Sequence, residues 1–209
     1  MSGKLQGLRA ISTNTLTNEY CIKQNSCGNE NNICTKCYSH SMLSTFRKNT
    51  APALQRNSDL LSSRLLEDTQ VPFINDAFHR FSAHGELINE THLANLCLIA
   101  SMNPFTKFSL WTKRNDLVQK YFADNKKPDN LTLLYSNPKI GTILSAPPRH
   151  FDKTFNNVPK YQDVDKQNCT GQKCVSCLLC YNSPVTTIVE AVKWKGMLFD
   201  GYLGTIMCG

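Results

Sequence analysis

The sequence lacks the long apolar runs that mark membrane proteins. No stretch approaches the roughly 18 apolar residues of a candidate transmembrane helix, and the first residues, MSGKLQGLRAISTNTLTNEYC, are polar, without the apolar segment of a secretion signal. We therefore expect a soluble protein of a reducing cytoplasm, with no membrane partner. In such a compartment clustered cysteines bind metals or do redox chemistry more often than they form disulfides.

The sequence also lacks internal repeats, low-complexity tracts and basic runs interleaved with aromatic residues. It carries 23 Lys and Arg against 16 Asp and Glu, a formal net charge of +7, but the basic residues are scattered. A solvated surface with a basic surplus is the simplest interpretation. An anionic substrate or a nucleic acid stays open as a partner.

Cysteine, by contrast, is abundant, with ten residues in a chain of 209. A chain of this length buries a core without covalent crosslinks. The C-terminal run CTGQKCVSCLLC contains Cys169, Cys174, Cys177 and Cys180. Its Cys-x-x-Cys-x-x-Cys core is typical of ligands to a four-iron cluster. Zinc, which usually takes two separated Cys-x-x-Cys pairs, and free thiols are the alternatives.

The N-terminal run CGNENNICTKCY contains Cys27, Cys34 and Cys37. Three thiolates on a four-iron cube leave one iron open to a substrate or cofactor, by the logic that separates open catalytic metal sites from closed structural ones. The alternative adds Cys21 as a fourth ligand and closes the site. We favour three ligands and an open iron.

Two further cysteines stand apart from these runs. Cys97 lies within the apolar segment HLANLCLIA and is expected to be a buried core thiol. Cys208, one residue from the end of the chain, is either a late ligand or an exposed thiol, and the sequence does not choose between them.

Strand and helix patterns alternate through the middle of the chain. We expect strands over 77–83, 107–113 and 130–137, and helices over 41–67, 89–103 and 114–122, with Leu54, Leu61 and Leu65 on one face of the first helix. A short edge strand is expected before Cys21, a polar connection over 149–168, and a strand or short helix over 186–194.

This alternation predicts an α/β fold with parallel strands and crossover helices. The chain is too short for an eight-fold barrel of about 250 residues, so we expect a partial (β/α) barrel or a small open parallel sheet. We expect residues 1–148 to form that α/β unit with its N-terminal cysteine loop. Residues 149–209 would be a Cys-rich extension packed on the same domain.

Polar residues follow each predicted strand, and in open α/β sheets sites gather at the carboxyl ends of the strands. The set comprises Ser82, His84, Glu86, Thr112, Lys113, Arg114, Ser136 and Asn137. His84, Glu86 and Lys113 are the candidate catalytic residues. Alternatively, Glu86 caps the helix that begins near Asn89, Lys113 and Arg114 are solvated loop charges, and His84 is a hydrogen-bonded structural residue.

The Cys-x-x-Cys-Tyr loop, the helix after it and RFSAHGEL at the end of the first strong strand together resemble the radical S-adenosylmethionine superfamily. The resemblance implies a four-iron cluster on three cysteines, and a Gly85-Glu86 motif that binds the amino group of the cofactor. Ser136, at the end of the third predicted strand, is a further candidate for cofactor binding. The spacing differs: six residues separate Cys27 from Cys34, where the superfamily has three.

The sequence resembles more closely a phage-encoded family, the gene product eighty-eight-like proteins, which look like short relatives of that superfamily. Residues 27–38, 80–86 and 169–181 carry this resemblance. It implies two cysteine-bound centres in a protein of the host cytoplasm.

The sequence thus predicts an iron–sulfur protein with one or two [4Fe-4S] clusters. As an enzyme it would use the open iron to deliver one electron to S-adenosylmethionine, or bind a small-molecule substrate directly. As an electron-transfer protein it would hold two closed clusters and exchange electrons with a donor. As an interaction module it would bind zinc. A further alternative is that both cysteine runs bind one larger cluster.

Overall fold

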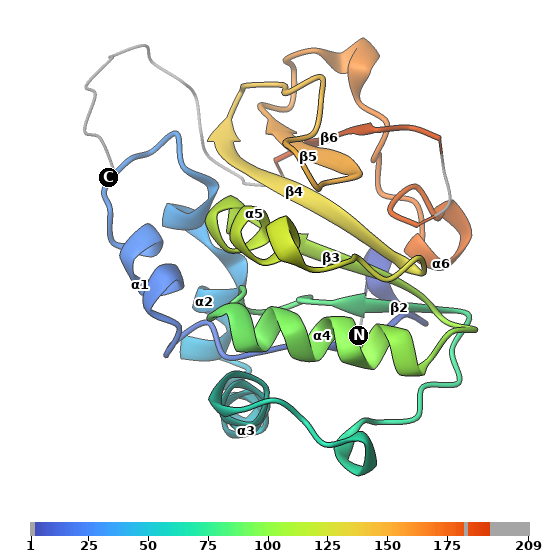
Figure 1. Ribbon diagram of the computed structural model, residues 1–209. Helices are drawn as coiled ribbons and strands as arrows, with labels where there is room; N and C mark the ends of the chain where they lie inside the picture. Colours follow the sequence, from blue (N-terminus) through green and yellow to red (C-terminus); the bar gives the residue numbers. More distant parts are fainter. Residues whose placement is uncertain (1–2, 182–183, 193–209) are drawn as a thin grey trace.

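A single six-stranded sheet forms the centre of the computed structural model, which describes residues 3–181 and 184–192 (Figure 1). The strands lie side by side in the order of the sequence, and all neighbours are parallel. They are β1 (Arg9–Ile11), β2 (Phe78–Phe81), β3 (Lys107–Thr112), β4 (Leu131–Ile140), β5 (Lys153–Val158) and β6 (Thr187–Ala191). The predicted α/β fold is confirmed, as an open parallel sheet that does not close into a barrel.

Helices cover one face of this sheet. The crossover helices α4 (Glu90–Met102) and α5 (Asn115–Asp124) follow β2 and β3, and α3 (Ala51–Ser63) packs on α4. Between the helices and the sheet lies the main apolar core, in which Phe81, Phe108 and Leu133 are fully buried. Cys97 is buried in the same core, as predicted.

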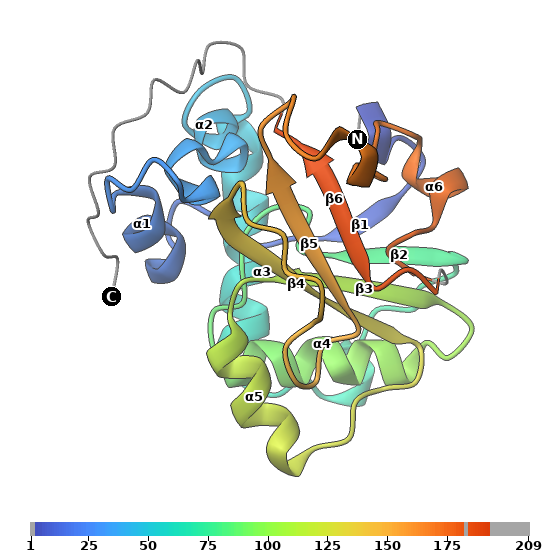
Figure 2. The same cartoon turned by 90° about the horizontal axis from the view of Figure 1, so that it is seen from above.

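The opposite face of the sheet carries a smaller apolar cluster of Leu134, Phe155 and Ile188, with Trp111 packed against it. The 3₁₀ helix Gly3–Leu5 contacts α6 (Cys174–Cys177) on this side. Figure 2 shows β2 and β3 lying between α4 on one side and α6 on the other. The C-terminal cysteines therefore lie on the face that the large helices leave uncovered.

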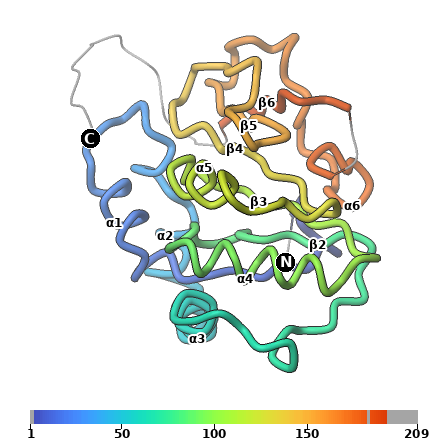
Figure 3. Tube along the Cα trace, in the orientation of Figure 1, coloured from blue at the N-terminus to red at the C-terminus, as the bar shows by residue number. Residues whose placement is uncertain are grey.

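A third group of short elements lies at the carboxyl ends of the strands. It comprises α1 (Glu19–Asn25), the 3₁₀ helix Ile33–Lys36 and α2 (Tyr38–Ser44), all between β1 and β2 in the chain (Figure 3). Asn18 donates its amide to the Glu86 carbonyl after β2 at 3.0 Å, and Tyr38 donates its hydroxyl to the Ala83 carbonyl at 2.9 Å. These bonds place the first cysteine run at the edge of the sheet where sites gather.

The single helix predicted over 41–67 is wrong. The chain forms α2, a 3₁₀ turn at Lys48–Thr50 and then α3, which ends at Ser63. Asn95 donates its side-chain amide to the carbonyls of Leu61 and Arg64, and thereby satisfies the end of α3. Consequently Leu65 is 62% exposed, and its neighbour Leu66 enters the core instead.

The polar connection predicted over 149–168 is also corrected, because it contains the buried strand β5. Of the two alternatives for residues 186–194, the strand is right over Thr187–Ala191, where β6 pairs with β5. Residues 193 and 194, and likewise Cys208, lie outside the described residues. The other predicted strands and helices are confirmed with ends that differ by at most three residues, and β1 is the expected edge strand. Short 3₁₀ helices at Asp68–Gln70 and Val164–Lys166 complete the described elements.

Within the described residues, none of the helices has both the length and the apolar character needed to cross a membrane.

Candidate metal centres

The N-terminal cysteine loop is fixed by hydrogen bonds to its own backbone. Asn32 caps the 3₁₀ helix Ile33–Lys36 by accepting the Cys34 N–H at 2.9 Å. Cys37 is the N-cap residue of α2, and its N–H donates to the Cys34 carbonyl at 3.2 Å. The amide nitrogen of Asn32 also lies 3.8 Å from the Cys27 sulfur. One asparagine thus contacts two of the three predicted ligands.

His84 connects the end of β2 to α2, which begins immediately after the last cysteine of this loop. Its Nδ1 lies 2.9 Å from the Ser39 hydroxyl, which in turn lies 2.7 Å from the Thr15 hydroxyl. Thr15 accepts the Gly85 N–H at 3.2 Å. This network supports the structural alternative for His84, because its contacts hold the elements around the site together.

Gly85 adopts a conformation that only glycine can occupy here. Its φ is +80°, and a Cβ at this position would lie 2.2 Å from the Thr13 hydroxyl and 2.6 Å from the Thr13 carbonyl oxygen. The residue predicted as half of a cofactor motif therefore also allows the segments after β1 and β2 to approach each other closely.

Glu86 is buried and receives three hydrogen bonds. Its Oε1 accepts the Leu87 N–H at 2.8 Å and the Thr112 hydroxyl, and its Oε2 accepts the Lys113 N–H at 2.8 Å. The carboxylate thus joins the ends of β2 and β3. The alternative in which Glu86 caps α4 is wrong, because the N-cap of α4 is Asn89, whose side chain accepts the His92 N–H.

Lys113 interacts electrostatically with two of the N-terminal thiols, Cys34 and Cys37. Burial lowers the pKa of Lys113, but Cys34, Glu86, Tyr20 and Cys37 together raise it above its ordinary value. Burial conversely raises the pKa of the Cys34 thiol, and Lys113 opposes that rise. The lysine is partly buried, and its charge acts on Cys34 and Cys37 of this cysteine group.

Cys21 lies in the same neighbourhood. Burial, and next the negative charge of Glu86, raise the pKa of its thiol, while Lys113 lowers it, and Cys37 and Cys34 add smaller increases. Its N–H donates to Asn18 at the start of α1. The four-ligand alternative, with Cys21 closing the site, therefore stays open.

The remaining strand-end residues hold the edge of the sheet together. Arg114 pairs with Asp116 at 2.6 Å and donates to the carbonyl oxygens of Leu87 and Ile88. The backbone N–H of Ser82 donates to Ile11 of β1 at 2.9 Å. Arg114 thus fixes the turn after β2 as well as carrying a partly solvated charge.

Ser136 and Asn137 are not at a strand end, which corrects that part of the prediction. Strand β4 continues to Ile140, so both residues are internal to it. Both are buried, and Asn137 donates its amide to Thr142 and Asn156. Asn137 therefore supports the loop after β4.

The C-terminal cysteine run lies against β6 and the smaller apolar cluster. The Cys169 N–H donates to the Val189 carbonyl at 3.0 Å, and Cys174 and Cys177 begin and end α6. Leu178 follows in a left-handed conformation, with φ of +53°. This reverses the chain toward Cys180, which packs with Cys169 on the apolar cluster.

Two cations flank these four thiols. Lys4 Nζ lies 3.7 Å from the Cys169 sulfur and 2.6 Å from Glu190. Arg80, on β2, is the second cation, and its charge acts on Cys174 and Cys180. Burial raises the pKa of the Cys180 thiol to about 12, while Arg80 lowers it and Cys174, Cys169 and Cys177 raise it further. Their mutual effects indicate that the four thiols form one group.

The family of the chain follows from its sequence as a whole. The model of the family described as Gene product 88 matches residues 2–167. The chain belongs to the gene product 88 family. Among the curated proteins and the solved structures, no match was found. The family match includes the N-terminal cysteines and strands β1 to β5, and it ends just before the C-terminal cysteine run.

The donor sets in this gene product 88 protein fit iron–sulfur chemistry by their residue types. In the described part of the chain, no three His, Cys, Asp or Glu side chains are grouped as ligands of one metal ion. A four-iron cluster bonds each thiolate to a different iron, so its ligands need not converge on a single point. Seven cysteines in two groups provide such ligands.

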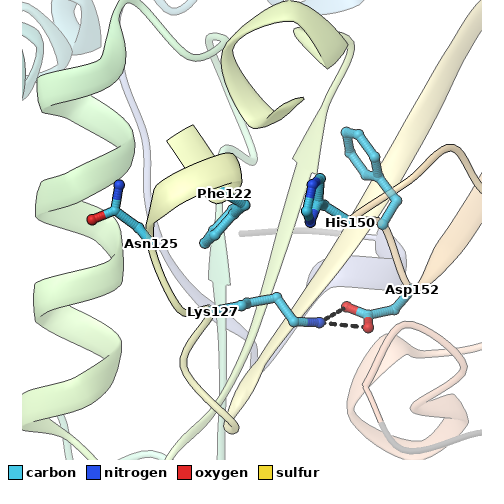
Figure 4. Close-up of a pocket in the computed structure, with 6 residues that line it drawn as sticks. Phe122, Asn125, Lys127, His150 and Asp152 are labelled. Atoms are coloured by element: carbon cyan, nitrogen blue, oxygen red, sulfur yellow. Dashed lines mark hydrogen bonds and ion pairs between the residues drawn. The ribbon is translucent and has the colours of Figure 1, made fainter. Parts of the chain in front are cut away.

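A polar cavity of about 480 Å³ lies beside the N-terminal group, lined by residues of α1, α3 and the turns after β2 and β3. Asn18, Tyr20 and Arg114 are among its lining residues, and Arg114 lies 5.2 Å from the centre of the Tyr20 ring. A second cavity of about 290 Å³ contains the Lys127–Asp152 ion pair (Figure 4). None of the predicted site residues lines that second cavity.

Several residues near the two cysteine groups were not predicted, namely Lys4, Tyr20, Asn32 and Arg80. Lys4 and Tyr20 are distant in sequence from their partners, so no local pattern identifies them. Arg80 could have been identified from the sequence, because it is a charged residue inside the strand segment AFHRFSA, which was expected to be buried, and a buried charge needs an anionic partner.

Proposed function

We propose that this gene product 88 protein is an iron–sulfur protein with two [4Fe-4S] clusters. Cys27, Cys34 and Cys37 would hold the first cluster and leave one iron open. The four C-terminal cysteines, Cys169, Cys174, Cys177 and Cys180, would hold a closed second cluster that relays electrons or supports the fold.

The observation that carries the proposal is the position of Lys113. Its positive charge acts on Cys34 and Cys37 from the turn after β3, and no hydrogen bond of its ammonium occurs within the described residues. A cation close enough to interact with thiols favours the thiolate form that binds iron. It also compensates the negative charge that a thiolate-bound cluster carries. A group of cysteines that served only to pack the protein would not need a lysine ammonium nearby that has no hydrogen bond.

A relation to radical S-adenosylmethionine enzymes is the finer part of the proposal. A carboxylate offers roughly four acceptor positions, and three positions of Glu86 are filled by Leu87, Thr112 and Lys113. One position on Oε2 is left for the amino group of the cofactor. When bound, the cofactor would supply the open iron with a substrate for one-electron reduction.

The first experiment measures iron, acid-labile sulfide and zinc on anaerobically purified protein, with electron spin resonance of the reduced protein. About eight irons and eight sulfides per chain would support two four-iron clusters. The Cys34→Ala/Cys37→Ala variant should lose about half of the iron and Cys177→Ala the other half. Zinc without sulfide would overturn the proposal in favour of a zinc-binding interaction module.

Addition of S-adenosylmethionine then tests the finer part. A changed spin-resonance spectrum in the wild type that is weakened in Glu86→Gln would support cofactor binding at the open iron. An unchanged spectrum with full iron would contradict cofactor use and leave an open cluster that binds its small-molecule substrate directly.

A closed electron-transfer centre is the second candidate, favoured by the position of Cys21 near Cys34 and Cys37. Cys21→Ala distinguishes the two. The open-iron proposal expects the iron content to be unchanged in this variant, whereas a closed site expects a partial loss of the first cluster. Cys97→Ala is a matched control, because Cys97 is buried in the core away from both groups.

A further inference from the structure

Arg80 occupies an unusual position for a charged residue. It lies in the middle of β2, on the sheet face that the cysteine run covers, and its guanidinium carbon is 4.2 Å from the centre of the Trp111 ring on β3. Trp111 in turn packs on Phe155 with ring centres 4.2 Å apart. The arginine is therefore held in place by stacking on an aromatic side chain.

The hydrogen-bond donors of this stack are incompletely used. Arg80 Nε and Trp111 Nε1 are both buried, and neither has a hydrogen-bond partner among the residues that the structure describes. Arg80 likewise forms no ion pair with a carboxylate in that part of the chain. A buried donor without an acceptor costs roughly 1–3 kcal/mol. These groups are thus placed for an anion that the protein itself does not supply.

Two of the C-terminal cysteines lie within the electrostatic reach of this stack. The positive charge of Arg80 acts on Cys180 and on Cys174. Lys4 acts on Cys169 and also on Cys174. A four-iron cluster on four thiolates carries a charge of about −2 when oxidised and about −3 after one-electron reduction. Cations and N–H donors near its sulfurs stabilise the reduced state more strongly.

We propose that Arg80, held on Trp111, is the hydrogen-bond donor and counter-charge of the C-terminal cluster and raises its reduction potential. This inference rests on the proposed function, since it requires the second cluster. Reduction adds one electron from an external one-electron reductant, for which dithionite serves in the experiment. No covalent bond forms or breaks, and Arg80 is a positioning residue that acts on the potential.

The experiment is a redox titration of the anaerobic full-length protein, followed by spin resonance, after iron and sulfide are measured on each sample. The variants are Arg80→Gln, which removes the charge, and Arg80→Lys, which keeps the charge without the planar donors. Arg56→Gln is the matched control, because it removes the same charge from an exposed position on α3. Cys34→Ala/Cys37→Ala identifies which redox wave belongs to the C-terminal cluster.

We expect Arg80→Gln to disfavour the reduced C-terminal cluster at least tenfold, which lowers its potential by about 59 mV for a one-electron couple. Arg80→Lys should give a smaller shift, and Arg56→Gln none. If Arg80→Gln loses the cluster, the comparison is made with Arg80→Lys: a lower potential than that of Arg56→Gln at full iron content supports the inference, and an equal potential overturns it. Equal shifts in Arg80→Gln and Arg56→Gln at full iron content would overturn this inference alone. Wild-type protein without iron would overturn the proposed function as well.

Discussion

The carboxylate of Glu86 and the ammonium of Lys113 lie on neighbouring strand ends, yet they form no direct ion pair within the described structure. Glu86 accepts the backbone N–H of Lys113 instead, together with two other donors. The carboxylate is thereby satisfied, and the lysine side chain remains available to the thiols of the N-terminal group. A single residue, Lys113, thus contributes its backbone to the sheet edge and its charge to the site.

We expect Lys113→Met to weaken iron binding at the N-terminal group by about 10–100-fold, the usual effect of removing a supporting partner of a metal ligand. Methionine has similar length but no charge. Iron affinity, measured by competition with a chelator, should be restored by Lys113→Arg and unchanged at the C-terminal group. Equal losses at both groups would indicate a general folding defect instead.

Gly85→Ala should destabilise the protein by about 1–3 kcal/mol or more, because the new Cβ meets Thr13 in addition to the strain of a positive φ. Gly28→Ala is the matched control, since Gly28 has a φ of +71° with nothing within 4 Å of the added Cβ. Urea unfolding of the metal-free proteins measures the loss of stability in each of the two variants. Equal losses would mean that backbone strain alone accounts for the effect.

At the scale of elements, the start of α4 depends on a neutral histidine. His92 lies in the first turn of the helix, is buried, and accepts the Ile88 N–H through Nδ1 at 3.2 Å. Burial lowers the pKa of His92 to about 4. Protonation would remove this acceptor and place a positive charge at the positive end of the helix.

The sign of the pH dependence follows directly. Below the ordinary histidine pKa of about 6.5 the unfolded chain binds a proton that folded His92 does not, so stability falls from about pH 6.5 down to about pH 4. The loss should approach about 3 kcal/mol, at about 1.4 kcal/mol per pH unit. Urea unfolding of the metal-free protein at several pH values should show a smaller decline in His92→Gln. His79 and His84, whose pKa values burial also lowers, account for the remaining decline.

The elements that the sequence predicted well are those with clear apolar patterns. The helix α4 begins at the Asn89 cap, and β2 and β3 each carry buried aromatic or apolar residues, namely Phe81 in β2 and Phe108 and Leu110 in β3. Strand β5 was missed because its segment KTFNNV is mostly polar, although every residue is buried. Asn156 is satisfied there by Leu144 and Thr154, and tertiary partners of this kind leave no mark in a local pattern.

The same limit applies to the site. Cysteine spacing indicated both groups of thiols, and the polar strand ends indicated Glu86 and Lys113. The stack of Arg80 on Trp111 joins two strands that the sequence separates by a whole crossover helix, so only the fold brings the two residues together. Likewise, Leu65 was misplaced because a distant asparagine, Asn95, ends the helix before it.

At the scale of the whole molecule, the family match and the sheet do not end at the same point. The gene product 88 match ends at residue 167, after five strands. The sixth strand lies beyond it, pairs with β5 from Thr154↔Thr187 to Val158↔Ala191, and buries Ile188 and Val189. Residues outside the match therefore complete the sheet. The C-terminal cysteines belong to the segment of chain that connects β5 to β6.

Truncation after Gln167 should consequently impair folding even without metal. Burial of Ile188 and Val189 together contributes about 3–6 kcal/mol, at roughly 1.5–3 kcal/mol per side chain, against a typical stability of 5–15 kcal/mol. The truncation would also expose β5 as a sheet edge, which favours aggregation.

Full-length protein with Cys169, Cys174, Cys177 and Cys180 changed to serine is the control, because it keeps β6 and removes the thiols. In metal-free urea unfolding we expect the serine variant to stay close to wild type and the truncated chain to lose most of its stability. Equal losses in the two proteins would mean that the cysteine run, and not the strand, stabilises this end of the sheet.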